Sequence, residues 1–298
     1  MQAYLGELSA LLVAVFWTFT AIAFEKASLK IGSLSLNVIR LFMGLFFLSL
    51  YVWIRSGSPF PTGATGFNWF WLTVSGLVGF VFGDLFLFKS YALIGSRFSM
   101  LIMTLAPPIT ALVGWIALGE RMSAMNLLGM FLTIAGISMA IFVRNNGRKG
   151  FSMQFSLKGF LFAFLGAAGQ GTGLVISKYG MQEFDPFAAT QIRLIAAIGG
   201  FAVLTTYLGR WRRVLSATRN KQGMSATALG SFFGPFLAVS FSLMAIKYTQ
   251  AGIAATIMAI VPILIIPPAV IIYKEKVRLL EIVGSVISIA GVSLLFLT

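Results

Sequence analysis

The chain has 298 residues, of which 58% are hydrophobic and 10% charged, and its mean hydropathy of +0.94 predicts a membrane protein rather than a soluble globule. The formal net charge of +14 comes from basic residues in short connections between apolar runs, which favours contact with anionic lipid headgroups and argues against nucleic acid as a partner. Histidine and cysteine are absent, which excludes disulfides, Cys/His metal sites and imidazole-based triads, so we expect no catalytic residue, no metal, no cofactor and no enzyme activity.

Ten apolar stretches follow one another along the chain, each of the length that a membrane-spanning helix needs, about 20 residues. In order they cover 5–24, 35–54, 68–90, 97–117, 125–143, 157–178, 187–207, 226–246, 252–272 and 280–297. The first has small residues at the spacing of a signal-peptide cleavage site, but it lacks a basic start and carries Glu7. We therefore expect it to be retained as a span.

The second five spans repeat the first five. Residues 119–138 return at 274–293, including the stretches Ile-Ala-Gly-Ile-Ser and Ile-Ala-Gly-Val-Ser. The offset is 155 residues from the third span of each half onward and 153 residues before it. Because five is odd, the second copy enters the membrane from the opposite side. The sequence predicts an all-α integral membrane protein of ten helices, two inverted five-helix repeats (1–146 and 147–298) around a central cavity.

Basic residues are unevenly distributed between the two sides of the membrane. The connections on one side hold sixteen: Lys26, Lys30, Lys89, Arg97, Arg144, Arg148, Lys149, Lys158, Arg210, Arg212, Arg213, Arg219, Lys221, Lys274, Lys276 and Arg278. The side that carries the termini holds four: Arg55, Arg121, Lys178 and Lys247. The positive-inside rule then places both termini outside the cytoplasm.

Two prolines interrupt apolar spans at equivalent positions, Pro107 in the fourth span and Pro262 in the ninth. Proline lacks the amide that would bond the carbonyl four residues earlier, so Met103 and Met258 should each keep a carbonyl without its helical partner. Such carbonyls are tolerated in a membrane where they face protein or water. One interpretation is a pair of broken helices that line the cavity and gate it; the other is a packing kink.

Asp84 is the only acidic residue that we place well inside a predicted span. An intramembrane carboxylate is costly, so it is a functional suspect that could bind an ammonium, take up a coupling proton or pair with a basic residue. Arg40 of the second span is a candidate partner, and a structural ion pair is the alternative. The second copy has Val239 at the equivalent place, so charge chemistry here would be one-sided.

Arg40 and Arg193 match across the copies, each near the start of a span. A substrate carboxylate could use either guanidinium. Arginine at that depth can also extend to the headgroups, and its recurrence in both halves favours a shared structural role.

Positions at which the copies differ are where one asymmetric solute could be recognised. Trp17 is matched by Gln170, and Asn37 by Thr190, next to Gln191. Aromatic and amide groups together suit an amphiphilic metabolite, although helix packing explains many such residues. The predicted cavity residues are Trp17, Thr20, Phe24, Asn37, Phe88, Tyr91, Met103, Thr104, Gln170, Gln191 and Met258. The glycines Gly76, Gly79 and Gly83 indicate close helix packing.

Several short stretches resemble the drug/metabolite transporter superfamily, in particular its ten-span EamA type. They are Gly-Asp-Leu-Phe-Leu-Phe-Lys at 83–89, Ala-Leu-Ile-Gly at 92–95, Pro107, Leu-Gly-Glu-Arg at 118–121 and, in the second half, Ile-Arg-Leu at 192–194. The resemblance implies a basket of helices around a central cavity and export of amino acids or related small metabolites. It also implies cytoplasmic termini, against the charge count.

Together these features predict a secondary carrier of the cell inner membrane that moves amino acids or similar metabolites by alternating access. Its partners would be a small-molecule substrate and the lipid bilayer, with a proton as one option for the coupling ion. No Gly-x-x-x-x-Gly-Lys-[Ser/Thr] loop occurs, so a gradient would supply the energy. The alternatives are an efflux pump for quaternary cations with Asp84 as the cation site, and a scaffold that transports nothing.

Overall fold

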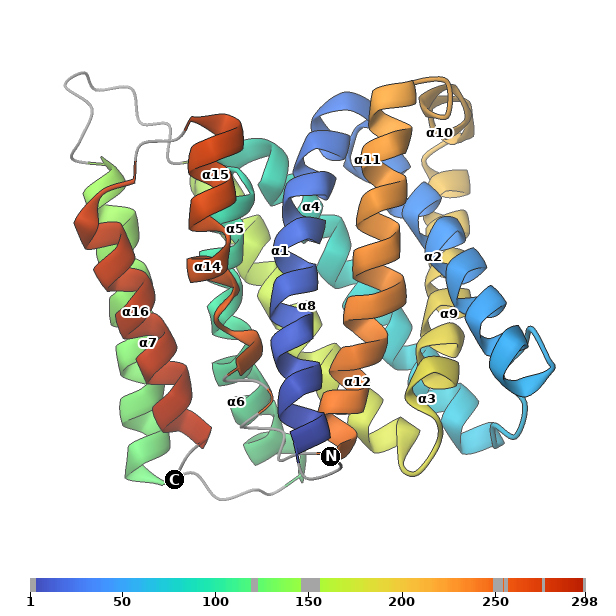
Figure 1. The fold of residues 1–298 in the computed structure, drawn as a ribbon, viewed down its shortest axis with the longest axis horizontal. Helices are drawn as coiled ribbons and strands as arrows, with labels where there is room; N and C mark the ends of the chain where they lie inside the picture. Colours follow the sequence, from blue (N-terminus) through green and yellow to red (C-terminus); the bar gives the residue numbers. More distant parts are fainter. Residues whose placement is uncertain are drawn as a thin grey trace.

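The computed structural model describes residues 4–118, 123–145, 156–248, 254, 257–274 and 277–296, and these form a helical bundle without strands (Figure 1). In chain order the elements are α1 (Leu5–Ile31), α2 (Ser33–Ser56), α3 (Gly66–Gly76), η2 (Leu77–Gly83), α4 (Asp84–Ile94), α5 (Ser96–Ile102), η3 (Met103–Leu105), α6 (Ala106–Leu118), α7 (Ala124–Asn145), α8 (Leu157–Met181), α9 (Pro186–Tyr207), α10 (Trp211–Ala217), α11 (Lys221–Ser231), η4 (Phe232–Ala238), α12 (Val239–Tyr248), α14 (Val261–Leu264), α15 (Ile266–Tyr273) and α16 (Leu279–Phe296). Two parts of the repeated segment, 119–122 and 275–276, lie outside the described residues.

The predicted architecture of ten apolar helical segments is confirmed. Seven segments of the described chain are long and apolar enough to cross a membrane, and three shorter apolar helices, Leu127–Met139, Val261–Ile272 and Leu279–Leu294, account for the other predicted spans. The first span is longer than expected, because the charged residues after position 24 continue the helix to Ile31. Only Gly32, with a φ of +79°, separates α1 from α2. The short helix α10 was not predicted.

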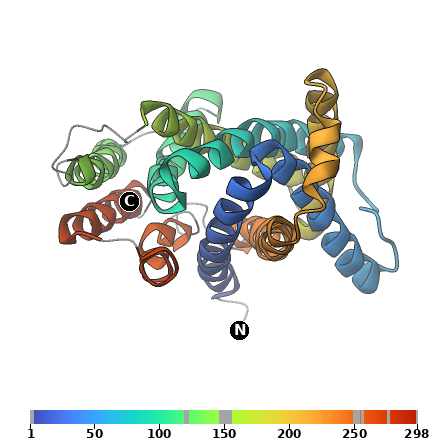
Figure 2. The same ribbon diagram turned by 90° about the horizontal axis from the view of Figure 1, so that it is seen from above.

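The two halves interlock. The third span of the first half (α3, η2 and α4) packs against α8, the first span of the second half, and the corresponding segment α11, η4 and α12 packs against α1. Equivalent helices also meet, α2 with α9 and α7 with α16, and the α7/α16 pair lies at one end of the bundle (Figures 1 and 2). This reciprocal packing is what two inverted copies produce around a shared axis.

A π-helix interrupts the third span of each half at the same place in the repeat. The two seven-residue segments, Leu77–Gly83 and Phe232–Ala238, are separated by the same 155-residue offset as the surrounding sequence. Asp84 and Val239 are therefore each the first residue after a π-helix. Such segments re-aim the side chains that follow them and are frequent at functional sites. The sequence analysis did not predict them, although Gly79 and Gly234 recur at this offset.

The fourth and ninth spans break next to the matched prolines, as predicted. A 3₁₀ turn, Met103–Leu105, separates α5 from α6 just before Pro107, and Pro262 occupies the first turn of α14, where a missing amide costs little. The Met103 carbonyl lacks its helical partner, as predicted, and the tighter 3₁₀ turn lets the Ala106 amide donate to it instead.

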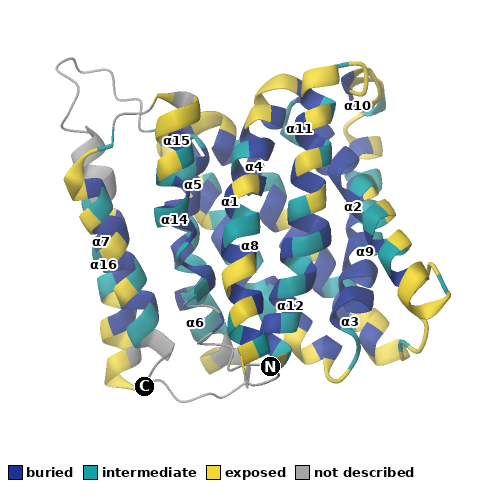
Figure 3. Cartoon of the chain, in the orientation of Figure 1, coloured by how far each residue is buried: buried dark blue, intermediate teal, exposed yellow. Residues whose placement is uncertain are grey.

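Large apolar side chains face outward, as a lipid environment requires; Ile54 and Val203, for example, are 79% and 72% exposed. Figure 3 shows exposed residues along the outer helix faces and buried ones where helices meet. The predicted close packing at glycines is confirmed. A Cβ built on Gly173 would lie 2.9 Å from the Cα of Gly79, and one on Gly83 would lie 3.3 Å from the Gln170 amide nitrogen.

Candidate substrate cavity

A cavity of about 460 Å³ lies between the two halves. Its walls come from α1, α2, η2, α4, α5, η3 and α6 of the first half and from α8, α9, η4, α12 and α14 of the second. That volume lies in the range of small-molecule sites, about 300–1,000 Å³. Both helix breaks contribute to the wall, through Pro107 and Pro262.

The cavity extends toward the face at which α1 begins. Lining residues there include Lys178 and Tyr179, near the end of α8, and Tyr179 is 48% exposed. The opposite end is lined by buried aromatic side chains. The rings of Phe24 and Phe88 are 5.0 Å apart, and the hydroxyl of the buried Tyr91 donates to Met100 Sδ over 3.3 Å. The lining residues are therefore exposed at one end of the cavity and buried at the other.

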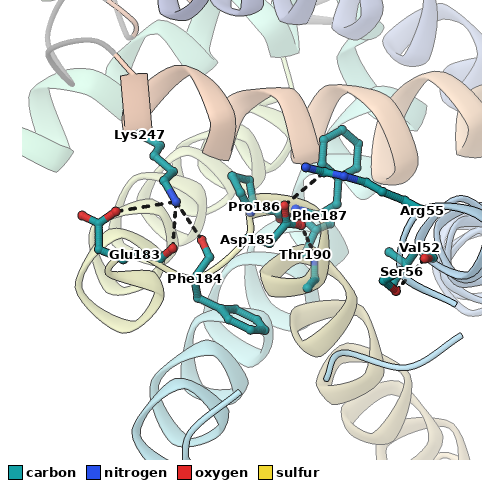
Figure 4. A network of polar contacts seen from close by, with 11 residues as sticks. Val52, Arg55, Ser56, Glu183, Phe184, Asp185, Pro186, Phe187, Thr190 and Lys247 are labelled. Atoms are coloured by element: carbon teal, nitrogen blue, oxygen red, sulfur yellow. Dashed lines mark hydrogen bonds and ion pairs between the residues drawn. The ribbon is translucent and has the colours of Figure 1, made fainter. Parts of the chain in front are cut away.

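Beside the exposed end, polar contacts tie together the helix ends of that face (Figure 4). Lys247, near the end of α12, donates to the carbonyl oxygen of Glu183 over 2.8 Å. Arg55, at the end of α2, lies 3.1 Å from the carboxylate of Asp185, which also caps α9 by accepting the amides of Phe187 and Ala188. Arg55 and Asp185 are 59% and 39% exposed, so this pair adds little stability.

A buried charge cluster forms one wall of the cavity. Arg40 Nη2 donates to Asp84 Oδ2 over 2.5 Å, and Gln170 Nε2 donates to the other carboxylate oxygen. Asn37 supports the pair by accepting Arg40 Nε over 3.1 Å and donating to the Asp84 carbonyl over 3.4 Å. The expected partnership of Arg40 and Asp84 is thus confirmed, and both oxygens of the carboxylate are occupied.

The preference for arginines that reach the headgroups is wrong. Arg40 and Arg193 are 2% and 3% exposed and line the cavity. Each guanidinium lies over an aromatic ring, with Arg40 Cζ 4.7 Å from the Phe88 centroid and Arg193 Cζ 4.8 Å from that of Phe80. The cavity and its rings provide polar and π contacts inside the bundle, so neither side chain has to leave it.

Asp84 is not the only acidic residue buried among the helices, contrary to what the sequence had indicated. Glu25 falls within the extended α1 and is buried, where it accepts the amide and hydroxyl of Ser96 over 3.1 and 2.5 Å. Glu281 of α16 is buried and lies 3.0 Å from Arg97. Neither lines the cavity, so Asp84 is the one acid among its described lining residues.

Most residues predicted from the sequence line this cavity. They are Trp17, Thr20, Phe24, Arg40, Asp84, Phe88, Tyr91, Met103, Thr104, Pro107, Gln170, Arg193, Met258 and Pro262. Their part in binding a solute stays a prediction. The structure places two residues elsewhere: Asn37 stands behind Arg40, and Gln191 donates to Ser49 Oγ and the Pro59 carbonyl. An amide side chain in a membrane span can line a cavity or link two helices by hydrogen bonds. Comparing the sequences of the two copies does not tell these two roles apart.

Phe80 and Pro235 are among the lining residues that the sequence did not predict. They match each other at the 155-residue offset, one in each π-helix. Phe80 also lies four residues before Asp84, the spacing that places two side chains on one helix face, and this signal could have revealed it.

Known proteins agree with this architecture. The model of the EamA-like transporter family matches the chain twice, over residues 4–142 and 157–297, one match in each predicted half. An uncharacterized transporter of Clostridium kluyveri is 27% identical over 141 residues, which span 47% of this chain and 44% of that protein. A known crystal structure has a TM-score of 0.69 at 16% identity, covering 100% of this chain and 97% of that one, and so supports the fold alone. The chain belongs to the EamA-like transporter family of the drug/metabolite transporter superfamily and is a multi-pass membrane protein.

Proposed function

We propose that the protein is a secondary carrier that exports amino acids or related small metabolites across the inner membrane by alternating access. The observation that carries this proposal is the cavity itself, which is lined by both inverted halves, with exposed lining residues at one end and buried aromatic ones at the other. Rocking of one half against the other would exchange the exposed and buried ends around a fixed site.

The lining supports a small amphiphilic solute. Aromatic side chains such as Trp17 and Phe88 offer apolar surface, while Gln170 and the arginines offer hydrogen bonds and charge. A proton remains the proposed option for the coupling ion, with Asp84 as the carboxylate nearest the solute space. The inner membrane is the proposed location because the energy source would be a gradient rather than a nucleotide.

Counterflow in proteoliposomes tests the proposal. Protein purified and reconstituted with an unlabelled amino acid inside should take up the labelled form from outside, faster than liposomes without protein. A folded protein that exchanges none of a panel of amino acids would contradict the substrate class. Exchange inhibited more strongly by a quaternary ammonium than by any amino acid would point instead to cation efflux.

A further inference from the structure

The charge cluster of the cavity is incomplete in its second half. By repeat position, Arg193 corresponds to Arg40, and Val239 corresponds to Asp84. In each half the arginine lies on the second span and its counterpart is the first residue after the π-helix. Arg40 has its carboxylate, whereas Val239 leaves Arg193 without one.

The surroundings of Arg193 agree with the lack of a carboxylate of its own. Its Nε is buried without a hydrogen-bond partner among the described residues, and none of their carboxylates forms an ion pair with it. The side chain is 3% exposed, and the guanidinium lies over Phe80 and lines the cavity. Arg40 lies over the same Phe80 ring, with its Cζ 5.6 Å from the centroid, so one carboxylate, that of Asp84, serves a region with two guanidiniums and forms its ion pair with Arg40. The second buried guanidinium is expensive in a membrane, so an anion that supplies further negative charge is favoured.

The helix opposite leaves room for this guanidinium. A Cβ on Gly79, in the π-helix η2, would lie 3.1 Å from Arg193 Nη2, and a Cβ on Gly76 would lie 2.5 Å from the carbonyl oxygen of Arg193. Small residues therefore let α3 and η2 approach α9 here and hold Arg193 at the cavity wall.

The charged residues of the lining favour an anion. Among the described lining residues Asp84 is the one acid, against the basic residues Arg40, Lys178 and Arg193. Both oxygens of Asp84 already accept hydrogen bonds, from Arg40 and Gln170, so this carboxylate is not free for a substrate ammonium. The aromatic walls suit an apolar body attached to the anion.

We infer that Arg193 binds the carboxylate of the solute, and that this carboxylate supplies the negative charge that Val239, in the position equivalent to Asp84, does not. The site then selects apolar or aromatic monocarboxylates, and an amino group is not required. This inference rests on the proposed function, since it names the class of solute for the same cavity. A carboxylate carries one negative charge and can accept two parallel hydrogen bonds from one guanidinium.

Three indole compounds of similar size separate the charges: indole-3-acetate is an anion, tryptophan a zwitterion and tryptamine a cation. Isothermal titration of the native protein in lipid nanodiscs should give binding of indole-3-acetate and tryptophan, and binding of tryptamine at least about tenfold weaker, as expected for a lost charge-assisted contact. Tryptamine that binds as tightly as indole-3-acetate would overturn the inference. Tighter binding of phenyl phosphate than of phenylacetate would overturn the choice of carboxylate.

Adding a carboxylate at position 239 provides the matched test. Val239→Asp supplies the missing acid, so its affinity for indole-3-acetate should be at least about tenfold lower than that of Val239→Asn, which has the same shape without the charge. Equal affinities in the two variants would contradict the inference. Because Val239→Asp recreates the arrangement of Arg40 and Asp84, we expect it to fold, and the compound series on the native protein does not depend on it.

Two results distinguish a failure of the anion site from a failure of the proposed transport. Indole-3-acetate that binds but is not exchanged in proteoliposomes would leave the anion site standing and contradict the proposed transport. Exchange of indole-3-acetate that survives in Arg193→Gln at the native rate would leave transport standing and contradict the anion site.

Discussion

Arg40 and Arg193 show how one residue type acquires two roles in a repeated protein. Arg40 is held by Asp84, Asn37 and Phe88, whereas Arg193 lies over Phe80 and forms no ion pair among the described residues. The sequence revealed the matched arginines and the unmatched Asp84, because equivalence and difference can be read along the chain. It did not reveal which side of its helix each arginine uses, since that depends on π-helices and on glycines of the other half.

Breaking the pair of Arg40 and Asp84 should destabilise the protein. Asp84→Asn leaves a buried guanidinium without its charge, and Arg40→Gln leaves a buried carboxylate, each at a cost of about 3–5 kcal/mol. The double variant should recover part of this loss, because no buried charge is then left alone. Thermal unfolding of the three variants in detergent measures the coupling.

Additive losses in the double variant would contradict a direct interaction. Asp84→Asn also tests the coupling role of the carboxylate: counterflow with an unchanged rate and an unchanged pH dependence would remove Asp84 from the mechanism.

At the scale of the helices, the segments in which the two copies are most alike form a contact between α7 and α16. Gly136 and Gly291 occupy equivalent places in the two Ile-Ala-Gly stretches, one on α7 and one on α16. A Cβ on Gly136 would lie 2.5 Å from the Gly284 carbonyl oxygen. The similarity of the two segments is therefore explained by the contact between them, away from the cavity.

Gly136→Ala should lower stability by about 1–3 kcal/mol, because the added methyl group meets backbone atoms that cannot move aside. Gly199→Ala is the matched control: Gly199 lies in α9 with no atom within 4 Å of an added Cβ, and alanine favours a helix over glycine. Thermal unfolding should rank Gly136→Ala below the native protein and Gly199→Ala at or above it. The reverse order would contradict the close packing of α7 on α16.

At the scale of the whole molecule, periodicity and repetition were enough to predict ten apolar segments and their inverted halves. Span length and an odd repeat number determine those features without reference to side-chain detail. The cavity wall was predicted only in part. Gln191 and Asn37 face helices rather than the cavity, and Phe80 and Pro235 face it because the π-helices rotate the third span of each half. The side of the membrane that holds the termini stays a prediction on which loop charge and the family resemblance differ.

The central claim is that the cavity between the two halves is the path of the solute. Ala111 and Leu112 are neighbours on α6, but Ala111 lines the cavity whereas Leu112 is absent from its described lining and is 37% exposed. Ala111→Trp fills the path, and Leu112→Trp places the same side chain outside it. In proteoliposome counterflow, Ala111→Trp should lose at least about 90% of the native rate, a tenfold effect corresponding to about 1.4 kcal/mol, while Leu112→Trp keeps most of it. Equal flux through the two folded variants would contradict the account.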